Sequence, residues 1–161
     1  MRQAIATHII TASEKLRRQR QYASKITIYT RTSLYTPIFY SQSATIHLSL
    51  PSNNSKILLS SALDLTEKIF HPNYLLMKAG VIMQKLVSEE HLQLNLFSAN
   101  TLKELSKQER LMKKIDYLNA RYGRNSIQWA ACGINQNHSN SQKYLSALKT
   151  TRIKEIPIVY A

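Results

Sequence analysis

The sequence predicts an α+β fold in which two helices cover one face of a small antiparallel sheet, followed by a small α/β domain at the C-terminal end. Three observations predict this class. Helix-type and strand-type hydrophobic patterns follow one another over the first ninety residues in the order α-β-β-α-β. A hydrophobic content of 43% is enough for a buried core in 161 residues. Elements in this order pack most simply with both helices on one side of the sheet.

Residues 2–22 are predicted to form the first helix, because apolar side chains recur there at spacings of three and four residues. Those side chains are Ile5, Ile9, Ala12 and Leu16. Residues 25–32 are β-branched and aromatic, which predicts a strand. Residues 43–50 alternate with period two and predict a second strand that stops at Pro51.

A second helix is predicted between Pro51 and Phe70, because a capping residue precedes a run of apolar side chains at helical spacing. The candidate caps are Asn53, Asn54 and Ser55. The apolar face comprises Ile57, Leu58, Ala62, Leu65 and Ile69. Residues 73–87 then predict a third strand, in which Gly80 marks either a bulge or a close contact.

The remainder of the chain is more polar. Residues 91–105 are interpreted as a linker, with SANTLKELSKQ (98–108) either part of that linker or the start of a helix. Residues 106–121 predict a third helix that ends at Gly123. Its apolar stripe is Leu111, Ile115 and Leu118. Residues 125–134, NSIQWAACGI, are expected to form a strand in the last domain, which spans residues 106–161.

Charge is the strongest global signal. The chain has 22 Lys and Arg against 9 Asp and Glu, which gives a net charge of +13. A surface of this kind favours a polyanion, most often nucleic acid, although a basic protein without such a partner is the alternative. A single cysteine fits a reducing cytoplasm, and no apolar run approaches the length of a membrane span or a leader.

The residues that would support catalysis or metal binding do not cluster in the sequence. Asp64 and Asp116 are interpreted as ordinary surface carboxylates. Cys132 and His138 are two ligands where a zinc site needs four. No glycine-rich phosphate loop is present among three glycines. The sequence therefore predicts no catalytic residues, no metal and no cofactor.

Strand alternation places polar and basic side chains on one face of the first strand, away from Ile26 and Ile28. These side chains are Lys25, Thr27, Tyr29 and Arg31. Together with Lys78 and Gly80 of the third strand they are candidates to contact DNA phosphates without reading the base sequence. The aromatic side chains around Pro37 either stack on bases or pack against the protein, and packing is favoured. They are Tyr35, Phe39 and Tyr40.

The stretch QLNLF has two interpretations. Its residues are Gln93, Leu94, Asn95, Leu96 and Phe97. Leu96 and Phe97 are adjacent apolar anchors for a pocket on another protein, and the Gln93 amide fixes the register. Alternatively, the stretch is an edge strand whose Leu94 and Leu96 face a core.

An ordered set of motifs resembles the C-terminal part of the UmuC family, the catalytic subunits of bacterial error-prone DNA polymerase V, which are Y-family translesion polymerases. The motifs, which extend over nearly the whole chain, are MRQAI, TASEKLRRQRQY, YTRTS, SATIHL, YLLMKAGVIM, QLNLF, LNARYGRNSIQWAACGI and LKTTRIKEIP. The resemblance implies that residues 1–90 form a truncated little finger domain that grips DNA and lacks its first strand. Residues 91–105 would then be a linker carrying the sliding-clamp motif, and residues 106–161 a small domain of unassigned function.

The resemblance also implies a function. The chain would be the DNA-binding and clamp-binding portion of a translesion polymerase in SOS mutagenesis, not catalytic alone because the palm carboxylates are absent. Implied partners are damaged or primed duplex DNA, the sliding clamp, a UmuD′ dimer and RecA, with no membrane. The alternative is a stand-alone basic adaptor that binds clamp and DNA and competes with or complements polymerases.

Overall fold

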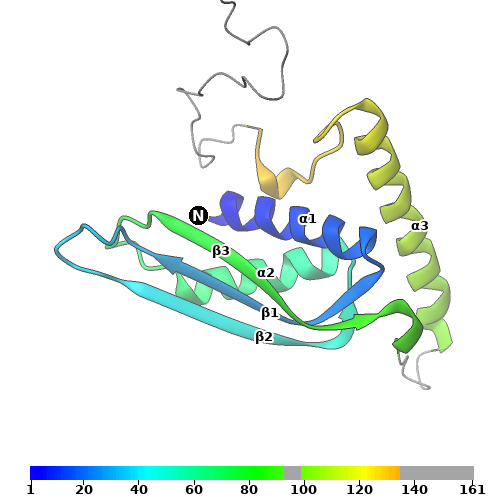
Figure 1. Cartoon of the computed structure of the whole chain (residues 1–161), viewed down its shortest axis with the longest axis horizontal. Helices are drawn as coiled ribbons and strands as arrows, with labels where there is room; N and C mark the ends of the chain where they lie inside the picture. Colours follow the sequence, from blue (N-terminus) through cyan, green and yellow to red (C-terminus); the bar gives the residue numbers. More distant parts are fainter. Residues whose placement is uncertain (93–98, 135–161) are drawn as a thin grey trace, which may run out of the picture.

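The computed structural model describes residues 1–92 and 99–134 (Figure 1). The order of elements in the first part confirms the α-β-β-α-β prediction. The elements are α1 (Arg2–Arg18), β1 (Gln21–Arg31), β2 (Ser41–Ser52), α2 (Ser55–Ile69), β3 (Lys78–Ser88), the 3-10 helix η1 (Glu89–His91), α3 (Ala99–Tyr122) and the 3-10 helix η2 (Ala130–Cys132).

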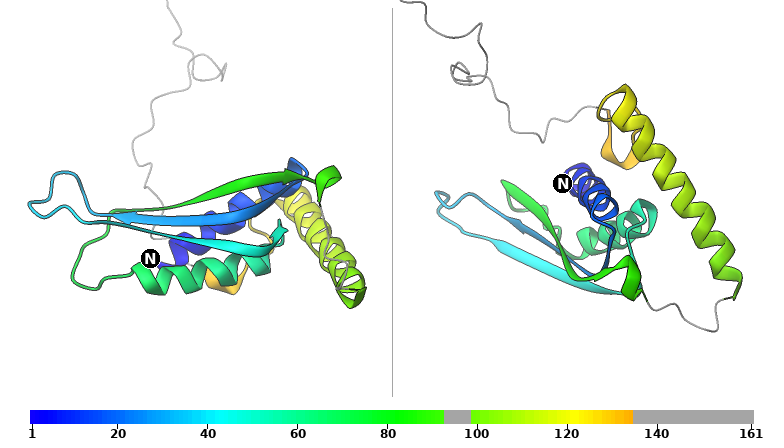
Figure 2. Two further views of the ribbon diagram at one scale, coloured as in Figure 1. Left: turned by 90° about the horizontal axis from the view of Figure 1, so that it is seen from below. Right: turned by 45° about the vertical axis from the view of Figure 1, so that its right-hand side comes forward.

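The three strands form an antiparallel sheet with the order β2-β1-β3, so β1 is central and the other two strands are edges. Both α1 and α2 lie on the same side of this sheet, as the two views in Figure 2 show. The opposite side carries no helix in the part of the chain that the structure describes. The predicted α+β class, with two helices on one face, is therefore confirmed.

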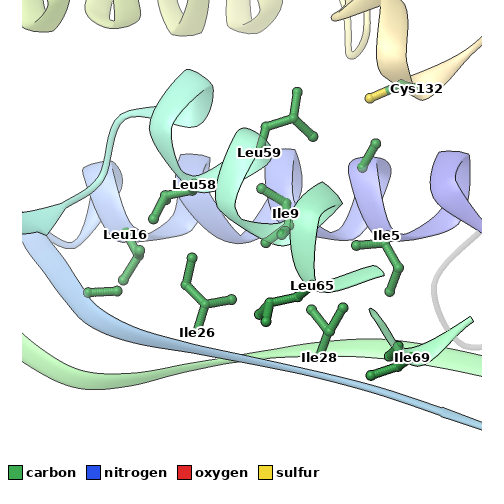
Figure 3. Packing of buried hydrophobic residues seen from close by; sticks show 13 residues of the cluster. Ile5, Ile9, Leu16, Ile26, Ile28, Leu58, Leu59, Leu65, Ile69 and Cys132 are labelled. Carbon is green, nitrogen blue, oxygen red and sulfur yellow. The ribbon is translucent and has the colours of Figure 1, made fainter. Parts of the chain in front are cut away.

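The core lies between the sheet and the two helices (Figure 3). Ile26 and Ile28 of β1 are fully buried and project toward the helices. They meet Ile5 and Ile9 of α1 and the buried leucines of α2. Burying a side chain of this size contributes about 1.5–3 kcal/mol, so these few contacts hold helices and sheet together.

The ends of the first elements differ from prediction for a local reason. α1 ends at Arg18, because the Gln19 amide closes the helix onto the carbonyls of Lys15 and Leu16 and Arg20 then takes a positive φ of 52°. The left-handed backbone at Arg20 turns the chain directly into β1 at Gln21, four residues earlier than predicted.

The start of α2 confirms one of the predicted caps. The Asn54 side chain accepts a hydrogen bond of 2.9 Å from the Lys56 amide, which satisfies one free N–H of the first turn. Pro51 does not stop β2, which runs to Ser52, because an edge strand tolerates a residue without an N–H. The pairing register of β1 and β2 also shifts between Ala23 and Lys25, next to this proline.

α3 packs against α1 and the start of α2 through polar contacts centred on Arg17. The guanidinium donates two hydrogen bonds to the Asp116 carboxylate, at 2.6 and 2.7 Å. It also donates to the Asn53 carbonyl and the Ser55 hydroxyl, both at 2.8 Å. One α1 side chain thus joins the start of α2 to the middle of α3.

Further contacts extend this interface. The Tyr22 hydroxyl donates to Glu109 at 3.1 Å, and the Asn54 amide donates to Gln108 at 2.7 Å. Met112 is the buried apolar residue among residues 106–122 of α3, whereas Leu111, which the sequence placed on the apolar stripe, is 53% exposed. The face of α3 turned toward the protein comprises Glu109, Met112 and Asp116, because the polar contacts fix the orientation of the helix about its axis.

Two predictions about the second part of the chain were wrong. α3 begins at Ala99 and not at residue 106, because good helix formers from Leu102 to Leu105 extend it into the expected linker. Residues 125–134 form turns and η2, not a strand. The Asn119 side chain binds the Ile127 amide at 2.8 Å and its carbonyl at 3.2 Å, so these backbone groups are not available to a strand partner. Cys132 then packs into the core cluster.

The Arg17–Asp116 pair should contribute more to stability than an exposed pair. The two side chains are 11% and 29% exposed, whereas those of Arg2 and Glu67 are each 64% exposed. We expect a coupling free energy of about 1–3 kcal/mol for Arg17→Met with Asp116→Asn. The control cycle, Arg2→Met with Glu67→Gln, should give below about 0.5 kcal/mol. Urea unfolding of both cycles measures this, and equal couplings would contradict the assigned role of Arg17.

The stability of the domain should fall above pH 10 through Tyr22. Burial, followed by the nearby Glu109 carboxylate, raises the pKa of Tyr22 from 10.0 to about 12. Between these values the unfolded chain loses the phenolic proton while the folded chain keeps it. The free energy of unfolding therefore decreases as pH rises through this window. Tyr22→Phe should remove the part of this decrease that Tyr22 causes. The measurement is the difference in the free energy of unfolding between the unmodified chain and Tyr22→Phe, from urea unfolding at several pH values between 9 and 12. A difference that does not change with pH would contradict the assignment.

Candidate nucleic-acid interface

The side of the sheet turned away from α1 and α2 is here called the open face. On β1 it presents the side chains predicted from alternation, which are Lys25, Thr27, Tyr29 and Arg31. Each is at least partly exposed, while Ile26 and Ile28 between them are fully buried. The predicted division of β1 into a core side and a polar side is confirmed.

Strand pairing extends the open face onto the edge strands, because directly opposed residues of an antiparallel pair project to the same side. Its four rows, in the order β2, β1, β3, are His47–Lys25–Gln84, Thr45–Thr27–Ile82, Ser43–Tyr29–Gly80 and Ser41–Arg31–Lys78. The predicted residues of β1 and β3 therefore lie on one surface. Four residues of β2, His47 among them, join them there and were not predicted.

The last row places two cations side by side. Arg31 and Lys78 are directly opposed across the β1–β3 pair, an arrangement that like-charge repulsion disfavours. The ion pairs within the described residues join Arg2 to Glu67 and Arg17 to Asp116, so neither cation is neutralised by a described carboxylate. An anion bound between Arg31 and Lys78 would relieve this repulsion.

Acidic residues are absent from the whole length of the three strands, from the loop between β1 and β2 and from the loop that leads into β3. Residues 21–55 and 70–88 contain no Asp or Glu, whereas they contain Lys25, Arg31 and Lys78 on the open face. The acidic residues of the described part lie in helical segments, namely Glu14, Asp64, Glu67, Glu89, Glu90, Glu104, Glu109 and Asp116. This separation of acidic from basic segments is visible in the sequence, but it was not predicted because no local motif marks it.

The middle of the open face is held by side-chain contacts. The hydroxyls of Thr27 and Thr45 lie 2.8 Å apart, and Thr27 donates to Gln84 at 3.3 Å. For Gly80 the sequence predicted either a bulge or a close contact, and the structure shows the close contact. The β1–β3 register is continuous through Gly80, and a Cβ there would collide with the Tyr29 ring. The approach of a phosphate to the Gly80 amide stays a prediction.

The loops at one end of the sheet are joined by aromatic packing. The rings of Tyr40 and Tyr74 stack with centroids 4.1 Å apart and planes 9° apart, and His71 contacts both rings edge-on. The packing expectation is confirmed for Tyr40. It was wrong for Tyr35 and Phe39, which are 97% and 54% exposed. Their loop projects past the helices, which therefore do not cover it (Figure 1).

Other predicted residues lie elsewhere. Gln93–Phe97 and His138 fall outside the described residues. β3 ends at Ser88 and η1 follows, so β3 does not itself reach the QLNLF stretch. Within residues 1–92 and 99–134, no three His, Cys, Asp or Glu side chains are grouped as metal ligands, and no helix is long and apolar enough to cross a membrane. Burial raises the pKa of the Cys132 thiol, which makes it a poor nucleophile.

Comparison with known proteins gives two family matches. Residues 1–96 match the impB/mucB/samB family C-terminal domain. Residues 109–159 match a domain of unknown function (DUF4113). The first match covers the whole of the sheet, α1 and α2, and the second begins within α3.

Whole-chain relatives agree with these matches. The chain is 32% identical over 158 residues to the protein UmuC of Salmonella typhimurium, which covers 97% of this chain and 37% of that protein. It is 30% identical over 160 residues to the protein ImpB of Salmonella typhimurium and 33% identical over 160 residues to the protein MucB of Escherichia coli, each match covering 98% of this chain and 37% of the relative. The chain thus spans little more than a third of the length of these relatives. The chain belongs to the impB/mucB/samB family, and residues 1–96 are its C-terminal domain.

Proposed function

We propose that this chain is the DNA-binding and clamp-binding portion of an error-prone translesion DNA polymerase subunit of the UmuC type, acting in SOS mutagenesis. The match to the impB/mucB/samB family C-terminal domain and the similarity to UmuC support this proposal. The observation that carries the DNA-binding part is the open face, which bears cations on strands that contain no acidic residue.

The chemistry of the open face suits the sugar-phosphate backbone. Lysine and arginine neutralise phosphates and release condensed counterions, while threonine and serine hydroxyls donate hydrogen bonds to phosphate oxygens. Such contacts fix the position of a protein on a duplex and carry no sequence information. A polymerase domain that follows the duplex along the template needs this kind of binding.

The dimensions of the open face also suit a duplex. The six steps from Lys25 to Arg31 span roughly 20 Å at the rise of a β-strand, and three strands are roughly 10 Å across. Twenty ångströms is the axial length of about six base pairs. Lys25 at one end and the pair Arg31 and Lys78 at the other are therefore spaced to meet separate phosphates.

The clamp-binding part of the proposal rests on residues 93–97 in the context of the family. QLNLF lies between η1, which ends at His91, and α3, which begins at Ala99. A segment between two ordered elements is a suitable place for a docking peptide, because binding there leaves both elements unchanged. UmuD′ and RecA, together with a cytoplasmic location, follow from the family resemblance alone and are assigned to no residues.

Neutralising the open face should weaken DNA binding. We expect the variant Lys25→Gln/Arg31→Gln/Lys78→Gln to bind a 20-base-pair duplex about tenfold or more weakly near 0.1 M salt, because up to three phosphate contacts are lost. Two duplexes of unrelated sequence should lose affinity equally. Fluorescence anisotropy with the full chain measures both effects.

A charge-matched control separates this effect from the loss of net charge. Lys15, Lys56 and Lys68 are exposed lysines on α1 and α2. Replacing all three with Gln lowers the net charge by the same amount and should change the affinity by less than about threefold. Equal losses in the two variants would contradict binding at the open face.

The clamp prediction has its own test. Leu96→Ala/Phe97→Ala should reduce binding to the sliding clamp of the same organism by at least about thirtyfold, since anchor residues contribute about 2 kcal/mol or more. Leu75→Ala/Met77→Ala, at side chains that are 92% and 67% exposed, is the matched control and should bind like the unmodified chain. Surface plasmon resonance provides the measurement. Unchanged binding of the first variant would rule out QLNLF as the docking peptide.

A further inference from the structure

Between residues 106 and 122, α3 carries its carboxylates on one face and most of its cations on the opposite face. Its inward face holds Glu109, which accepts from Tyr22, and Asp116, which binds Arg17. Gln108 and the buried Met112 lie on the same side. The carboxylates within residues 106–122 are therefore both used in packing α3 against the sheet domain.

The outward face carries four of the five cations of residues 106–122, whereas the fifth, Lys113, lines a cavity with Glu109 and Asp116. Five exposed residues follow one another at spacings of three, four, three and four, so they form a single stripe along the helix. This outer stripe consists of Lys107, Arg110, Lys114, Tyr117 and Arg121. No acidic residue occupies a position of the stripe between Lys107 and Arg121. A helix face that is merely solvated usually mixes both signs, and this one does not.

The C-terminal end of the stripe, at Arg121, is ordered by aromatic neighbours. The Arg121 guanidinium donates a 2.7 Å hydrogen bond to the Tyr117 hydroxyl and lies 5.6 Å from the centre of the Tyr122 ring. These contacts restrict the side chain while leaving other N–H groups free to donate. In the described part of the chain, the ion pairs involve none of the four stripe cations.

We propose that the outer stripe of α3 is a second nucleic-acid-binding surface, which takes the sugar-phosphate backbone of duplex DNA. The stripe is roughly 21 Å long at the rise of an α-helix, about the axial length of six base pairs. It lies largely within residues 109–159, the region that matches a domain of unknown function. The inference therefore assigns a ligand class to part of that domain.

The arrangement favours a phosphate backbone over a membrane surface. A helix that binds a bilayer inserts its apolar residues into the lipid. In α3 the apolar side chains Met112, Ile115 and Leu118 are buried or half-buried against the protein. Leu111, which is 53% exposed, is the one large aliphatic side chain exposed between residues 106 and 122. The rest of the exposed surface offers mainly cations and tyrosines, which suit phosphates and sugars.

The test uses the full chain and a labelled 20-base-pair duplex. Arg110→Gln/Lys114→Gln/Arg121→Gln should lower the slope of log affinity against log salt concentration by roughly 2 to 3, since each lost phosphate contact lowers it by about 0.9. The control variant Lys15→Gln/Lys56→Gln/Lys68→Gln carries the same net charge and should change the slope by less than about 1. All three stripe residues are exposed and lack ion pairs in the described part of the chain, so thermal melts of both variants should coincide with that of the unmodified chain.

The outcomes separate this surface from the open face. A stripe variant with the unmodified slope, or with the same change as the control, overturns the inference. Loss of binding to anionic lipid vesicles without loss of DNA binding also overturns it, in favour of a membrane. The open-face variant Lys25→Gln/Arg31→Gln/Lys78→Gln is measured in parallel. If the open-face variant binds like the unmodified chain while the stripe variant binds more weakly, the proposed function of the sheet fails and the stripe is supported.

Discussion

One-sided burial of a three-stranded sheet is the constraint on which the rest of this structure depends. Two helices pack on one side, where Ile26 and Ile28 are fully buried, and the side chains between them must point the other way. A sheet covered on one side keeps a face available to water, and the residues there are free of packing demands. In this chain that face holds lysine, arginine, threonine and tyrosine without any carboxylate.

The same separation of roles recurs in α3. Arg17 attracts Asp116, and Tyr22 attracts Glu109, so both acidic residues between positions 106 and 122 of the helix are turned toward the protein. Because a helix has opposite faces, fixing Glu109 and Asp116 inward directs Arg110 and Lys114 outward. The packing of α3 and the positive charge of its exposed face therefore both follow from one orientation of the helix about its axis. The open face and the outer stripe of α3 both carry cations, consistent with a net charge of +13.

The sequence predicted the structure correctly where one hydrophobic periodicity dominated. It failed where individual long-range contacts determine which residues face the core and where a strand can form. Alternation along β1 correctly separated Lys25 and Arg31 from the core, and the cap of α2 was correctly placed at one of three residues. Of the apolar stripe predicted for α3, Leu111 is exposed, because the orientation of the helix follows an ion pair between residues ninety-nine positions apart. The strand expected at residues 125–134 was wrong because the Asn119 side chain takes up the Ile127 backbone groups. No local pattern records such long-range partners.

The most direct test of the central claim, that DNA lies on the open face, is lysine footprinting. The full chain would be acetylated briefly with and without a saturating duplex, and each lysine read by mass spectrometry. Lys25 and Lys78 should become protected, while Lys56 and Lys68 of α2, on the helix-covered side, react at unchanged rates. Protection of the α2 lysines with Lys25 and Lys78 still reactive would place DNA on the opposite side of the domain and contradict the account.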